Sequence, residues 1–65
     1  MDIQQILKEI RSAGYTQQEV ADIVGLTQGT VSSIERGAVK RTFALLELLK
    51  LHKVAMRRMK KRDTV

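Results

Sequence analysis

The sequence contains no cysteine and no proline, and its only aromatic residues are Tyr15 and Phe43. The absence of cysteine excludes disulfides and thiolate metal sites as sources of stability. The single histidine and the seven carboxylates form no cluster with ligand spacing, so we expect no metal and no cofactor. No apolar run approaches the roughly 20 residues that a membrane-spanning helix requires.

A chain of 65 residues has the length of one domain, here taken as 1–65. A domain of this size buries only about 60% of its unfolded surface, so its margin of stability is thin. Oligomerisation is the remaining common reinforcement, and we expect a homodimer. The first five residues lack the basic start and the apolar stretch of a signal peptide, so we expect a cytoplasmic protein without membrane contact.

Basic residues outnumber acidic residues by 12 to 7, for a net charge of +5. A basic domain is a candidate for binding a polyanion, chiefly nucleic acid. Many small domains are also basic for solubility alone, so the charge leaves both interpretations open. We do not expect an enzyme or a small-molecule ligand, because the chain has no nucleophile–base–acid set and a thin core offers no substrate pocket.

The apolar pattern predicts an all-α fold, since no segment alternates with the period of a strand. The first helix spans about 2–12, is capped by Asp2, and has a stripe made of Ile3, Ile6, Leu7 and Ile10. The second begins at Thr16, which with Glu19 forms a capping box, and ends at Gly25. Its expected inward residues are Val20, Ala21, Ile23 and Val24.

A third helix is predicted over about 27–36, with Thr27 as its cap and Val31 and Ile34 on its inner side. A fourth is predicted from Phe43 to about 62, with the tail 60–65 frayed. One apolar stripe of this helix comprises Leu45, Leu48, Leu49, His52, Ala55, Met56 and Met59. Four apolar residues, Phe43, Leu46, Leu51 and Val54, lie outside that stripe. The helix therefore needs a second packing partner, which another copy of the chain could supply. The expected dimer interface comprises Leu51, His52, Val54, Ala55, Met56 and Met59.

The segment 16–37 has the features of a helix-turn-helix unit. Ala21 is small where the two helices cross, and Gly25 permits a positive φ in the turn. Leu26, Val31 and Ile34 anchor the second helix to the core. In such a unit the second helix enters the major groove of DNA and the first crosses the backbone.

The sequence resembles the Cro/repressor family of phage and bacterial regulators, also called the XRE family. The likeness covers roughly 3–52, and its motifs are Thr16-Gln17-Gln18-Glu19-Val20-Ala21, Gly25-Leu26-Thr27 and Val31-Ser32-Ser33-Ile34-Glu35-Arg36-Gly37. The resemblance implies a compact lambda-repressor-like fold of four or five helices and binding to operators as a dimer. The chain departs from the family pattern in having Thr42 at the usual proline position and no polar break between a fourth and a fifth helix.

Base readout requires donors and acceptors on the outer, amino-terminal part of the recognition helix. Gln28 is the best candidate, because its amide can pair with both N6 and N7 of adenine. Thr30, Ser32 and Ser33 can offer hydroxyls, although the two serines are equally consistent with a merely small helix surface. Gly29 would allow the backbone to approach the groove closely.

Phosphate contacts form a separate group, because they position the protein without reading sequence. Gln17 resembles the backbone-binding glutamine of the family and lies at a helix amino terminus, which favours anions. The other candidates are Thr27, Arg36, Lys40 and Arg41. In the family, the residue at the position of Glu35 usually pairs with an arginine of the first helix, so the resemblance implies a structural salt bridge, for which Arg11 is the nearest cation of the predicted first helix.

The carboxy-terminal basic run has three open interpretations: a solvated face, a further DNA contact, or the polar rim of a dimer. Its members are Lys53, Arg57, Arg58, Lys60, Lys61 and Arg62. The leading function is a repressor of transcription that binds double-stranded DNA as a homodimer. The alternatives are the antitoxin of a toxin–antitoxin pair, with a protein partner, and an RNA-binding or protein-interaction module. Few aromatic residues make RNA binding the weaker of these.

Overall fold

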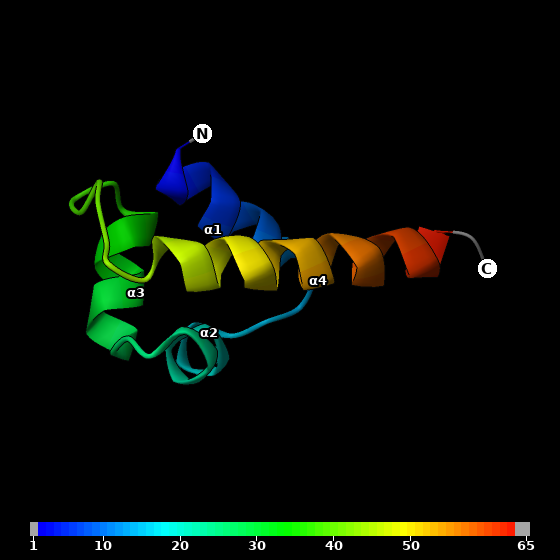
Figure 1. Ribbon diagram of the computed structural model, residues 1–65, viewed down its shortest axis with the longest axis horizontal. Helices are drawn as coiled ribbons and strands as arrows, with labels where there is room; N and C mark the ends of the chain where they lie inside the picture. Colours follow the sequence, from blue (N-terminus) through cyan, green and yellow to red (C-terminus); the bar gives the residue numbers. More distant parts are fainter. Residues whose placement is uncertain (1, 64–65) are drawn as a thin grey trace.

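Four α-helices make up the fold in the computed structural model, which describes residues 2–63 and the side chains of 2–59. The helices are α1 (Ile3–Ser12), α2 (Gln17–Val24), α3 (Gln28–Glu35) and α4 (Leu45–Asp63). The helix α4 runs along the whole molecule, with α1 and α2 on either side of it and α3 beside its amino-terminal end (Figure 1). The all-α prediction is confirmed, and one continuous α4 replaces separate fourth and fifth helices.

Short polar side chains begin the first three helices, as the sequence predicts. Asp2 accepts a hydrogen bond from the Gln4 N–H (3.1 Å), and the Thr27 hydroxyl accepts one from the Thr30 N–H (3.2 Å). Thr16 and Glu19 form the reciprocal capping box, with bonds of 3.1 and 3.0 Å. The bond from the Thr16 N–H holds the pKa of the Glu19 carboxyl below its ordinary value.

The core draws on all four helices. The largest fully buried side chains are Ile6, Leu7, Ile10, Val20, Val31, Ile34 and Leu48. No helix in the described part of the chain is long and apolar enough to cross a membrane. The predicted inner faces of α1 and α3 are confirmed, and α4 reaches Asp63, beyond the point where we expected fraying to begin. The rest of the predicted frayed tail, 64–65, lies outside the described residues.

Two details of the predicted packing are wrong. Ile23 of α2 is 54% exposed, and Leu45 and Leu49 of α4 are also exposed. Leu51, which the period placed outside the main stripe, is buried together with Leu48 and Ala55. The reason is that α1 and α2 pack on two sides of α4, so the buried stripe is rotated toward α2 relative to the one that periodicity alone favours.

The turn between α2 and α3 depends on Gly25, which has φ +79° and ψ +30°. Both Gly25 and Leu26 donate their N–H groups to the carbonyl of Ala21 at 2.9 Å, which closes the end of α2. This left-handed conformation costs a glycine little and other residues more. The turn therefore sets α3 at its angle to α2, with Val31 and Ile34 buried and the opposite face outward.

Candidate nucleic-acid interface

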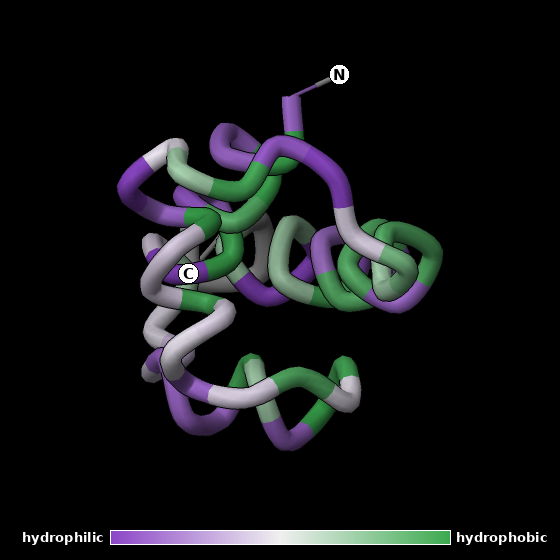
Figure 2. Tube along the Cα trace, turned by 90° about the vertical axis from the view of Figure 1, so that its left-hand side faces the viewer, coloured by the Kyte–Doolittle hydropathy of each residue, from purple (hydrophilic) through white to green (hydrophobic). Residues whose placement is uncertain are grey.

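The outward face of α3 consists of polar residues and of residues with small side chains. Gln28 and Gly29 are exposed at its amino-terminal end, and Thr30, Ser32 and Ser33 are half-buried. Figure 2 views the molecule from this end, where α3 is drawn mostly in the pale colours of glycine, serine and threonine. Because these residues favour a helix weakly, local propensity does not account for their presence on an exposed helix.

The hydroxyl groups of α3 differ in how far they are engaged within the protein. Ser33 donates to the Gly29 carbonyl (3.0 Å) and accepts from the Arg36 guanidinium (3.3 Å). Thr30 and Thr27 share a hydroxyl–hydroxyl bond of 2.9 Å. Ser33 and Thr30 thus already stabilise the helix and its cap, which leaves Gln28 as the longest exposed polar side chain on α3.

Gln28 is connected to the interior of the protein through a chain of polar contacts. Its amide donates to Gln17 Oε1 (3.4 Å), and the Gln17 amide donates to Glu35 Oε2 (3.3 Å). The other oxygen of Glu35 forms a salt bridge with Arg11, as the family resemblance implies. The Gln4 amide also donates to the Glu35 backbone carbonyl at 2.8 Å. This network joins α1, α2 and both ends of α3.

The network has two consequences for the surface. Pairing with Arg11 offsets the negative charge of Glu35, which would otherwise lie near a polyanion. The side chain of Gln17 is half-buried and oriented by Glu35, and it in turn meets Gln28. A side chain held in advance loses less conformational freedom when it binds a ligand.

Cationic side chains lie next to α3 in the following loop. Arg36 caps the helix, and Arg36, Lys40 and Arg41 are all exposed. This loop precedes α4 and lies at the same end of the molecule as α3 (Figure 2). The arrangement combines a polar helix with flanking point charges, the two kinds of group that read bases and bind phosphates.

Comparison with known families identifies this arrangement. A family model described as helix-turn-helix matches residues 3–54. The chain belongs to this family. It is a helix-turn-helix regulator of the XRE type, and its partner is DNA. Searches of curated proteins and of solved structures found no match.

In this helix-turn-helix protein the residues expected at a dimer interface have different environments. Ala55 is fully buried in the core of the single chain, and Leu51 is 6% exposed, at the edge of that core, where it lines an open groove with Ile23 and Val54. Met56 and Met59 are half-buried against that core. Only Val54 is well exposed, at 53%.

His52 has a partner within the chain. Its Nε2 lies 2.5 Å from Glu9 Oε1, which links α4 to α1. Hydrogen bonds from Gln5 and from His52 hold the pKa of the Glu9 carboxyl below its ordinary value. Within the single chain, His52 therefore helps to hold these two helices together.

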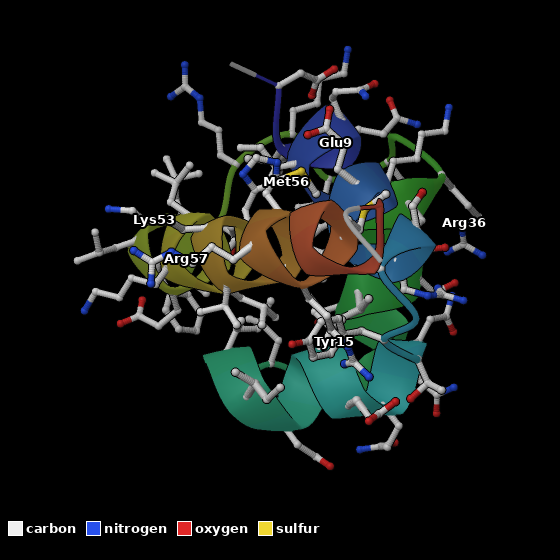
Figure 3. The ribbon with its side chains drawn as sticks, turned by 90° about the vertical axis from the view of Figure 1, so that its right-hand side faces the viewer. Glu9, Tyr15, Arg36, Lys53, Met56 and Arg57 are labelled. Atoms are coloured by element: carbon white, nitrogen blue, oxygen red, sulfur yellow. The ribbon has the colours of Figure 1, made fainter. Side chains whose placement is uncertain are left out.

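The basic run of α4 is divided between two environments. The Arg58 guanidinium lies 5.4 Å from the centre of the Tyr15 ring, a cation–π contact beside α2. Lys53 and Arg57 point into solvent from the side of α4 that faces away from α3 (Figure 3). The side chains of Lys60, Lys61 and Arg62 lie outside the described residues.

Sequence reasoning did not anticipate the contacts of Gln4 and Gln17 with Glu35, nor that of Gln17 with Gln28. These pairs are 31, 18 and 11 residues apart, so no periodic pattern within one helix reports them. The one available signal was the clustering of glutamines at helix starts. It identified Gln17 and Gln28 individually and gave no indication that they meet.

Proposed function

We propose that this chain is a transcriptional repressor that binds a palindromic operator as a homodimer. Each copy inserts α3 into the major groove of one half-site, while α2 crosses the backbone. Two such helices contact half-sites about one helical turn, or about 34 Å, apart. Repression then follows because the bound dimer covers the promoter and excludes RNA polymerase.

The observation that supports this proposal most strongly is the outward position of Gln28 at the start of α3. Its contact with Gln17, and through it with Glu35 and Arg11, connects the exposed amide to the rigid body of the domain. An amide in this position can pair bidentately with adenine, a contact that contributes about 1–3 kcal/mol of discrimination between bases. We assign Gln28 the main base-reading role.

The remaining residues of α3 have supporting roles in this proposal. Gly29 has no side chain, so it lets the helix approach the base edges closely. Thr30 and Ser32 offer a methyl or a hydroxyl to nearby bases. Ser33 is bonded to the Gly29 carbonyl and to Arg36, which favours a role in orienting the arginine over direct readout.

The phosphate-binding set comprises Gln17, Thr27, Arg36, Lys40 and Arg41. The last three are exposed cations in and around the loop that follows α3. Each phosphate that a cation neutralises releases condensed counterions and makes the affinity more sensitive to salt. A dimer uses every contact twice, so its affinity falls steeply as salt increases.

Selection of bound duplexes from a random-sequence pool tests this proposal. The expected result is an inverted repeat whose half-site centres lie about one turn apart, bound by two proteins per duplex. Titration of the selected duplex against salt should give a slope of about −0.9 for each phosphate contact. A reporter placed behind the selected site should lose expression when the protein is produced.

Two results would contradict the proposal. Enrichment of no sequence would mean that the basic charge gives only nonspecific affinity. Enrichment of a single, non-repeated site bound by one protein would retain DNA recognition and reject the homodimer. Tight binding of a protein that releases the chain from its DNA would favour the antitoxin alternative.

A further inference from the structure

We propose that the outer face of α4, together with Ile23 of α2, is the surface on which two copies of this chain pair, with their α4 helices antiparallel about a two-fold axis. The inference rests on the homodimer of the proposed function, and it names the residues that form the contact. Of the six residues that sequence reasoning assigned to the interface, Val54 lies on this surface and Leu51 lines the groove beside it.

Large apolar side chains are exposed on this surface. Phe43 is 87% exposed, Leu46 59%, Ile23 54% and Val54 53%. Leu46 and Val54 are eight residues apart, so they lie on one side of α4, and Phe43 lies in the turn that leads into this helix. Scattered apolar residues are normal on a protein surface, but a group of this size on a small domain indicates an interface.

An open groove separates α2 from α4 beside these residues. Ile23, Leu51 and Val54 form its apolar walls, and Glu47 and Lys50 contribute opposite charges. Both charged residues are exposed, and neither has a salt bridge among the described residues. The groove thus has apolar walls, one carboxylate and one ammonium group, with the charged residues three positions apart on α4.

These residues are self-complementary in one arrangement. If the two-fold axis crosses α4 between residues 48 and 49, antiparallel pairing places Glu47 of each copy opposite Lys50 of the other. The same register places Phe43 opposite Val54 of the other copy, at the groove. Both ion pairs and both apolar contacts form together, as an isologous interface requires.

Other arrangements lack this match. Parallel pairing would oppose Glu47 to Glu47 and Lys50 to Lys50, which are repulsive contacts. Antiparallel pairing also places the two α3 helices at opposite ends of the dimer, because α3 lies beside the amino-terminal end of α4 (Figure 1). Lys53 and Arg57, which point into solvent nearby, form a charged border around the apolar contact (Figure 3).

Sedimentation velocity over a range of protein concentrations, without DNA, measures self-association directly. We expect Phe43→Ala to raise the dimer dissociation constant about tenfold or more, since Phe43 is the largest apolar side chain of this surface and aromatic side chains contribute strongly to interface energetics. Lys8→Glu, on the exposed side of α1, is the control and should leave the constant unchanged. Phe43 is exposed, so an unchanged far-ultraviolet circular dichroism spectrum should accompany its loss.

A charge exchange tests the register. Glu47→Lys and Lys50→Glu should each weaken self-association, whereas the double variant should recover it. A mixture of the two single variants should form a heterodimer more readily than either forms a homodimer, because both facing pairs then have opposite charge. Wild-type protein that stays monomeric at high concentration, or charge variants that all behave like wild type, would overturn the proposal.

Binding to a duplex with one half-site separates this inference from the proposed function. The Phe43→Ala protein keeps its α3 face, so it should retain the base preference of the wild type on a half-site. If the base preference exists but charge exchange has no effect on association, the interface is wrong and DNA reading stands. If charge exchange behaves as expected but no sequence is preferred, the interface stands and operator reading fails.

Discussion

Replacing one of two adjacent leucines in α4 tests which side of this helix packs against the rest of the protein. Leu48 is fully buried, whereas Leu49 is 38% exposed. The substitutions Leu48→Ala and Leu49→Ala remove the same atoms from neighbouring positions of the same helix. Their intrinsic effect on helix formation is therefore equal, and any difference in stability reports burial and packing.

The expected magnitudes are well separated. A fully buried leucine replaced by alanine destabilises a protein by about 3–5 kcal/mol, because it loses transfer free energy and leaves a cavity. A partly exposed leucine leaves no closed cavity and should lose about 1 kcal/mol. A chain of 65 residues, at about 0.05–0.15 kcal/mol per residue, has a total stability of about 3–10 kcal/mol. Leu48→Ala should thus consume a large share of the stability of the domain.

Urea unfolding followed by circular dichroism at a fixed, low protein concentration measures both variants. The midpoint should fall much further for Leu48→Ala than for Leu49→Ala, with similar slopes. If Leu48→Ala does not fold at all, Leu48→Met should retain most of the stability, since it conserves volume. Equal losses of stability in the two variants, or a larger loss for Leu49→Ala, would refute the conclusion that α4 buries Leu48 and exposes Leu49.

Three further predictions concern single positions. Gly29→Ala should raise the free energy of unfolding by about 0.5–1 kcal/mol, because alanine favours a helix and a Cβ at this position meets only the Thr27 hydroxyl, at 4.0 Å. The same substitution should weaken DNA binding, because the added methyl group lies on the face of α3 that contacts DNA. Gly25→Ala should lower the stability by about 1–2 kcal/mol and Gly25→Asn by less, since a Cβ finds open space and only the positive φ is unfavourable; equal losses would contradict this reasoning. Hydrogen bonds from Gln5, and then from His52, lower the pKa of the Glu9 carboxyl in the folded protein below its ordinary value of 4.5. The ionised Glu9 side chain therefore stabilises the folded protein above pH 4.5, and this stabilisation is lost as the pH falls through the lower folded pKa. Thermal melts between pH 5 and pH 2 should accordingly show a weaker acid loss for Glu9→Gln, and an unchanged slope would exclude the contribution.

Much of the fold follows from local sequence. The caps at Asp2, Thr16 and Thr27 depend on side chains that bond to backbone two or three residues away, so a short stretch of sequence reports them. Gly25 marks the turn for the same reason, since the requirement for a positive φ is local. The bounds of α1, α2 and α3 are accordingly close to those predicted.

The orientation of α4 could not be predicted in the same way. Its first half is apolar nearly all round, so the 3.6-residue period fits more than one buried face. The choice between Leu51 and Leu49 as a core residue depends on where α1 and α2 pack, which is a tertiary property. Ile23 was misplaced for a related reason, because it follows the apolar pattern of α2 yet lies at the open groove.

The candidate DNA-binding surface shows the same division. The identity of Gln28 as an outward residue follows from the start of α3 and from the buried positions of Val31 and Ile34. Its contact with Gln17, and the support that Glu35 gives to Gln17, require three helices to be assembled. Sequence therefore predicts which residues face outward, and packing determines which of them are held in place.

The most direct test of the central claim is the ratio of the dissociation constant on a duplex of scrambled sequence to the dissociation constant on the selected duplex. It should be measured for the wild type, for Gln28→Ala, and for Gln5→Ala as an exposed glutamine on α1. We predict that Gln28→Ala lowers this ratio about tenfold or more for each half-site, while its affinity for the scrambled duplex and the ratio for Gln5→Ala remain close to wild type. A Gln28→Ala protein that keeps the wild-type ratio would contradict the assignment of base reading to the start of α3.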